Sequence, residues 1–152
     1  TNQLAKHIQE LYFGGNWTSV SLKSVLEDVT WKEAIQSQKS FNSIATLVNH
    51  INYYVHAVGN VLEGQELHAK DDLSFNHSVI NSKGDWEAFL TQVWIDGEKL
   101  SVLVENMNEE VLFKDFTQTK YGSYFRNLLG IIEHGHYHLG QIALLKKLQR
   151  SE

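Results

Sequence analysis

The sequence has no cysteine and no proline among its 152 residues. Without cysteine the chain forms no disulfide, has no thiolate nucleophile and offers no sulfur ligand to zinc or iron–sulfur clusters. Without proline no helix is forced to end by a missing backbone donor, which favours long helices. Histidine, in contrast, occurs eight times. A transition-metal site in this chain would therefore use nitrogen and oxygen ligands.

Long apolar runs and an excess of basic charge are also lacking. No segment reaches the roughly 18 consecutive apolar residues expected of a membrane-spanning helix, and the first residues do not resemble a secretory signal. We therefore expect a cytoplasmic protein without a membrane partner. Lys and Arg number 13 against 18 Asp and Glu, for a formal net charge of −5. This balance argues against a nucleic-acid partner, because a phosphate-binding surface needs a basic patch.

Apolar residues recur at helical spacing in four segments, which predicts an all-α fold built as a four-helix bundle. The segments run from Leu4 to Tyr12, from Ile44 to Leu62, from Trp86 to Met107 and from Tyr124 to Leu148. Gly97 falls on the buried line of the third segment and indicates a close helix approach. The capping-box pattern of Thr30 and Glu33 predicts a short helix before the second segment. The length fits one domain, 1–152, since domains cluster near about 100–150 residues.

Two long connections join these segments, at 65–84 and at 108–122. Connections of this length are uncommon inside compact domains and often have a function. The first is long enough to act as a crossover, which would let the second and third long helices run parallel. Ser123 is the expected N-cap of the last helix.

His134 and His138 lie four residues apart in the last predicted helix. On a helix they share one face, about 5–6 Å apart at their β-carbons, and can bind one divalent ion. The glutamate of an HExxH metalloprotease is missing between them, so the pair does not predict a protease. Two merely exposed or core-edge histidines remain the alternative.

A third ligand must come from another helix, and His50 at the edge of the second apolar stripe is the candidate. Three nitrogen ligands with open positions describe a catalytic site, and imidazole suits both zinc and nickel. The other histidines have different expected places. His56 and His136 fall on other helix faces, His68 and His77 lie in the first connection, and the roles of His7 and His77 stay open.

Two further side chains are candidates for support of the metal or for contact with a substrate. Gln141 lies on the same side of its helix as the histidine pair and could orient a ligand or a substrate; it could equally be a surface or interface glutamine. Tyr54, one turn beyond His50, could donate to a substrate oxygen or fill the core. No general base is evident, because Glu133 is expected to point away from the pair.

The chain resembles the DinB-like family. The resemblance is carried by EHGHYHLGQI at 133–142, LVNHI at 47–51 and GGNW at 14–17, and its order and spacing cover essentially the whole chain. It implies a four-helix bundle with an unusual helix order and long crossover connections, commonly a homodimer. It also implies a three-histidine divalent metal site, with His50, His134 and His138 as ligands by position and with zinc or nickel as the ion.

Some members of this family use the metal to activate a low-molecular-weight thiol for transfer or isomerisation. The resemblance therefore implies a metal-dependent enzyme of the thiol transferase or hydrolase type, acting on a small molecule. The alternative is a non-catalytic homodimer of the stress response, in which the metal only stabilises the fold.

Overall fold

The computed structural model describes residues 1–38 and 40–151. Over this part of the chain the protein is all-α, as predicted, with no β-strand. The long helices are α1 (Asn2–Phe13), α4 (Ile44–Leu62), α6 (Lys83–Glu105) and α7 (Tyr124–Gln149). Shorter elements connect them: α2 (Leu22–Leu26), α3 (Trp31–Ile35), α5 (Asp71–Ser74) and the 3₁₀ turns η1 (Glu109–Val111) and η2 (Thr119–Tyr121).

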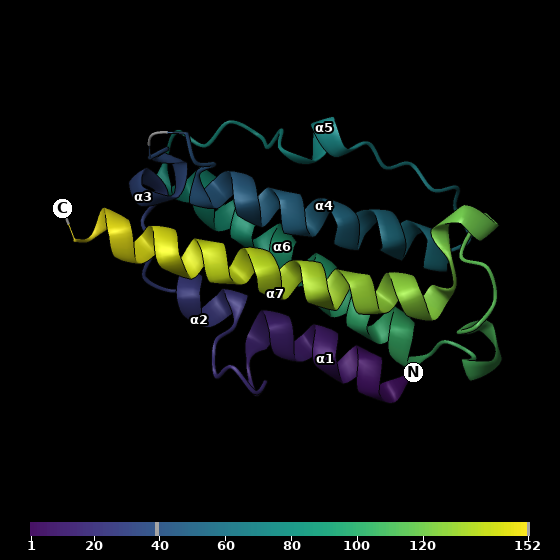
Figure 1. The fold of residues 1–152 in the computed structure, drawn as a ribbon. Helices are drawn as coiled ribbons and strands as arrows, with labels where there is room; N and C mark the ends of the chain where they lie inside the picture. The colour runs from purple at the N-terminus through teal and green to yellow at the C-terminus, as the bar shows by residue number, and fades with distance from the viewer. Residues whose placement is uncertain (39, 152) are drawn as a thin grey trace.

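The four long helices lie side by side, and each corresponds to one of the four predicted segments. Helix α1 packs on α6 and α7, and α4 packs on the same two helices. Helices α4 and α6 run in one direction, opposite to α1 and α7 (Figure 1). This parallel course, expected from the long first connection, is possible because the connection with α5 returns along the outer side of α4 (Figure 1). None of the helices in the described residues is both long and apolar enough to cross a bilayer.

The predicted apolar stripes form the core between these helices. The largest fully buried side chains include Ile8, Leu11, Tyr12, Ile51, Val55, Leu100, Leu128 and Ile142. Burying one such aliphatic or aromatic side chain contributes about 1.5–3 kcal/mol relative to leaving it in water. The core therefore fixes how α4 and α7 are rotated about their own axes. This rotation decides which side chains the two helices turn toward each other.

Serine or threonine side chains cap the beginning of α2, α3, α4, α6 and α7. The hydroxyl of Ser123 accepts a hydrogen bond from the backbone N–H of Arg126, as its predicted N-cap role requires. Thr30 and Glu33 form the predicted reciprocal capping box of α3. Helix α2 was not predicted, because its five residues are too few to show a helical apolar period. Its capping box pairs Ser21 with a second serine rather than with the usual glutamate.

Gly97 makes the close approach that the sequence indicated. A β-carbon at this position in α6 would overlap the ring of Tyr12 in α1. The Tyr12 side chain is fully buried and packs directly on the α6 backbone. The absence of a side chain at Gly97 thus sets the distance between α1 and α6.

Candidate metal centre

Three histidines from two helices meet in the space between α4 and α7. One ring nitrogen from each of His50, His134 and His138 lies within 4.8 Å of the others. The Nε2 atoms of His50 and His134 are 3.0 Å apart. This is close to the separation of about 3.3 Å between two ligand nitrogens of a tetrahedral zinc ion with Zn–N bonds near 2.05 Å. The three residues selected from the sequence are therefore the ones that the fold brings together, and they can hold a metal ion.

Ser74 fixes the orientation and the tautomer of the His50 ring. His50 Nδ1 lies 2.6 Å from Ser74 Oγ, and the Ser74 hydroxyl donates its own proton to the carbonyl oxygen of Asp71. The serine oxygen must then accept from the ring, so Nδ1 of His50 carries the proton. Nε2 is left with a free lone pair, and this is the nitrogen that faces His134.

Gln141 orients the His138 ring in the way that Ser74 orients the His50 ring. Its side-chain oxygen accepts a hydrogen bond from His138 Nδ1 at 2.7 Å, which leaves Nε2 of His138 free to bind a metal. Since Gln141 follows His138 by three residues, both side chains lie on one face of α7. This contact supports the interpretation of Gln141 as a residue that orients a ligand.

The electrostatics of the cluster favour the neutral form of His50 and His134. Burial, followed by the effects of the neighbouring His138 and His50, lowers the pKa of His134 to about 4. Burial also lowers the pKa of His50, followed by the effect of His138. Only the neutral ring has a nitrogen lone pair for a metal, so the two histidines are in their ligand form at neutral pH.

Aromatic side chains enclose the cluster on its α5 side. Phe75 stacks on the His50 ring with 4.1 Å between ring centroids. Tyr54 meets His50 and His134 edge-on, at 5.3 and 5.1 Å. His50 itself is only 5% exposed. These contacts hold the rings in place and keep bulk water away from one side of the site.

Tyr54 also connects the cluster to an acidic residue that the sequence did not single out. Its hydroxyl donates to Asp71 Oδ1 at 2.6 Å, and burial together with this hydrogen bond raises the Tyr54 pKa to about 12. Tyr54 thus has a polar partner as well as ring contacts. Asp71 lies in α5, and the one signal for it was the acidic pair at 71–72 inside a long polar connection.

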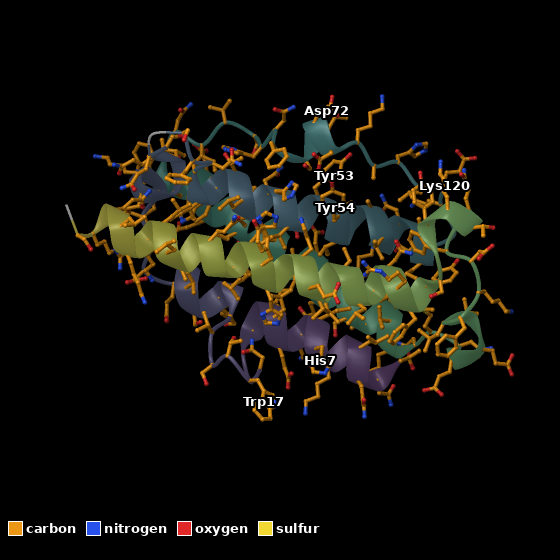
Figure 2. All side chains as sticks on the ribbon, viewed as in Figure 1. His7, Trp17, Tyr53, Tyr54, Asp72 and Lys120 are labelled. Carbon is orange, nitrogen blue, oxygen red and sulfur yellow. The ribbon has the colours of Figure 1, made fainter. Side chains whose placement is uncertain are left out.

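A cavity of about 540 Å³ opens beside the histidines. Its lining includes His50, His134, Tyr54 and Asp71, and also a cationic side formed by Lys120 and Arg126 with Tyr121 and Asn127. Figure 2 shows Tyr53 and Tyr54 beneath the α5 connection and Lys120 near the start of α7. Both long connections therefore contribute to the surroundings of the cluster.

The remaining histidines lie outside the cluster. His7 faces Glu10 with 3.6 Å between Nδ1 and Oε2, and Figure 2 shows His7 on the far side of the bundle from Tyr54. His77 Nδ1 lies 2.7 Å from the carbonyl oxygen of Ser78. His68 is near Glu66, His56 is near Asp96, and His136 is half-buried without joining the site. Glu133 is exposed beside Arg126, as expected.

Comparisons of the chain with protein-family models, with curated proteins and with solved structures gave no match.

Proposed function

We propose that the protein is a divalent-metal-dependent enzyme of the DinB-like type, with His50, His134 and His138 as the metal ligands. The observation that carries this proposal is the convergence of three imidazoles, with His50 oriented by Ser74 and His138 by Gln141, beside a cavity of about 540 Å³. Zinc or nickel bound by three histidines lowers the pKa of a bound water or thiol and supplies a nucleophile at neutral pH.

The cavity supports an enzyme rather than a purely structural metal site. A site whose only role is to join α4 and α7 needs no space beside the ion, whereas catalysis needs room for a substrate. Lys120 and Arg126 place two cations on the side of this cavity. We propose that they hold an acidic group of a small-molecule substrate, since a guanidinium binds carboxylates and phosphates with paired hydrogen bonds.

Asp71 and Tyr54 are the residues positioned to handle a proton. Tyr54 keeps its proton, because burial and the contact with Asp71 raise its pKa to about 12, and its hydroxyl donates to Asp71 Oδ1. A carboxylate has two oxygens, and Tyr54 needs only one of them. We propose that Asp71 Oδ2 accepts a proton from the nucleophile or the substrate during the reaction.

The fold type and the dimer belong to the same proposal. The packing of α1, α4, α6 and α7, with a long crossover between α4 and α6, supports a DinB-like bundle. For a homodimer, support comes from exposed apolar side chains at 137, 144 and 148 of α7. Their spacing places Tyr137, Leu144 and Leu148 on one helix face, where a second copy would cover them. Sedimentation at micromolar concentration tests this point, and a monomer would contradict it.

Metal content per chain tests the ligand assignment. We expect about one zinc or nickel ion in the purified protein and almost none after His134→Ala, by elemental analysis. His136→Ala is the matched control, because His136 neighbours the ligands in sequence but lies outside the cluster. Equal metal content in all three proteins would refute the site.

A second experiment separates the enzyme from the non-catalytic alternative. Co²⁺ in place of the natural ion reports its ligands through visible absorption, and azide is a small probe that binds only where a coordination position is open. We expect azide to change the Co²⁺ spectrum of the wild-type protein. An unchanged Co²⁺ spectrum at saturating azide would support the alternative of a non-catalytic protein that the metal only stabilises.

A further inference from the structure

Asp96 is a buried carboxylate on the face of α6 that packs against α4, and it is separate from the histidine cluster. Its side chain is only 7% exposed. Asn52 Nδ2 donates to one carboxylate oxygen at 2.7 Å and Gln92 Nε2 to the other at 2.8 Å. Both partners are neutral amides. His56, which is half-exposed, lies with Nε2 3.8 Å from Asp96 Oδ1.

This arrangement leaves a buried charge without a permanent cationic partner. The lysines and arginines that form ion pairs in the described residues pair with other carboxylates. Removing a carboxylate from water is costly, and neutral amides recover only part of that cost. A cation that docks next to Asp96 would recover more of it.

The carboxylate lies at a groove of about 720 Å³ between α4 and α6, which we call the Asp96 groove. The edge of the α5 connection borders it, and its charged side chains are Asp96, Asp85 and the titratable His56. Among the described residues that line it, none is a lysine or an arginine. Tyr53, which is labelled in Figure 2, and Phe89 add aromatic surface.

We propose that the Asp96 groove binds a small organic cation, a primary amine or a guanidinium compound with an apolar body. The charged group would bind at Asp96, and the apolar body would lie against Tyr53 and Phe89, where its apolar surface is removed from water. Each bond of a cationic donor to a carboxylate is a charge-assisted hydrogen bond, which is stronger than the neutral kind.

An inorganic cation fits the groove less well. The amide nitrogens of Asn52 and Gln92 point at Asp96, and the Asn52 oxygen faces the Tyr12 hydroxyl at 3.4 Å. Mg²⁺ and Ca²⁺ bind about six or more oxygens, whereas both Asp96 oxygens already accept hydrogen bonds from amide groups. The groove shares no lining residue with the cavity beside the histidines. Binding of a cation in the Asp96 groove is therefore independent of whether the histidines bind a metal.

Calorimetric titration of the full chain with putrescine tests the proposal, with 1,4-butanediol as the neutral analogue of the same length. We expect saturable putrescine binding, near one per chain, and no binding of the diol. Asp96→Asn should weaken putrescine binding about tenfold or more, because a bond to a charged group is lost. Glu98→Gln removes the same charge from an exposed position of the same helix and should leave the affinity unchanged within about twofold.

A second pair of variants leaves the buried carboxylate in place. His56→Lys supplies a built-in ammonium beside Asp96 and should weaken putrescine binding about tenfold or more, whereas His56→Gln should retain it. Circular dichroism checks that each variant is folded. The proposal is overturned if putrescine and the diol behave alike, if Asp96→Asn and Glu98→Gln have equal effects, or if His56→Lys binds as well as His56→Gln. Displacement of putrescine by an equal concentration of Mg²⁺ would also overturn it.

Discussion

His50 Nδ1 and Ser74 Oγ lie 2.6 Å apart and connect helix α4 to the α5 connection. Ser74 is fully buried, so water does not replace its hydroxyl as the partner of the ring. Because the serine proton goes to the Asp71 carbonyl, the hydroxyl oxygen sets the tautomer of His50. A residue that binds no metal itself thus decides which nitrogen of His50 can bind one.

We predict that Ser74→Ala lowers the affinity for Zn²⁺ by about 10–100-fold, because residues that orient a ligand have effects of this size. Competition with a chromophoric chelator measures the affinity directly. Ser78→Ala is the matched control, since Ser78 lies in the same connection with an exposed side chain. The role assigned to Ser74 is wrong if both variants bind Zn²⁺ as tightly as the wild-type protein.

Metal removal should lower the thermal stability of the protein. A ligand at about 100 times its dissociation constant adds about 2.7 kcal/mol to folding, and each kcal/mol shifts Tm by about 2–4 °C in a protein of this size. We therefore expect a chelator to lower Tm by about 5–10 °C, measured by calorimetry. The His134→Ala variant should show almost no response. An equal loss in both proteins would mean that the chelator acts elsewhere.

The long helices were predictable because their signal is local. The stripes from Ile44 to Leu62 and from Tyr124 to Leu148 repeat the helical period over several turns, and their facing follows from counting residues. Helix α2 and the 3₁₀ turns were not predictable in this way. Elements of three to five residues bury too few side chains to produce a period.

The ligands of the candidate site were also predictable, whereas their surroundings were not. The spacing of His134 and His138 alone places them on one helix face. His50 lies at the edge of the apolar stripe of α4, as the pair does on α7. Asp71 and Ser74 reach the site only because the connection at 65–84 folds back along α4. No periodicity encodes that path, so the only available signal was that a connection of this length often has a function.

Gly97→Ala should destabilise the protein by about 1–3 kcal/mol, the usual cost of overpacking a core. The new methyl group would overlap the ring of Tyr12, which is fully buried. Urea unfolding measures the effect. Gly59→Ala is the control, because a β-carbon there meets no atom within 4 Å. It should be neutral or stabilising by up to about 1 kcal/mol, and equal effects of the two changes would contradict the close approach of α1 and α6.

The pair of Glu33 in α3 and Arg150 at the end of α7 should make stability depend on pH in the acid range. Hydrogen bonds from Arg150 and then from Thr30 lower the Glu33 pKa from 4.5 to about 2. A carboxyl group with a lowered folded-state pKa stabilises the protein fully above the unfolded-state value. This contribution is lost as the pH falls from about 4.5 toward 2.

Glu33→Gln should therefore cost about 1–2 kcal/mol at pH 7, less than an unscreened pair because solvent weakens surface charges. The stability of the Glu33→Gln variant should also fall less steeply than that of the wild-type protein below pH 4.5. Urea unfolding at a series of pH values measures this difference. Glu27→Gln, at an exposed position nearby, should leave the pH profile unchanged, and parallel profiles for wild type and Glu33→Gln would show that Glu33 does not stabilise the contact between α3 and α7.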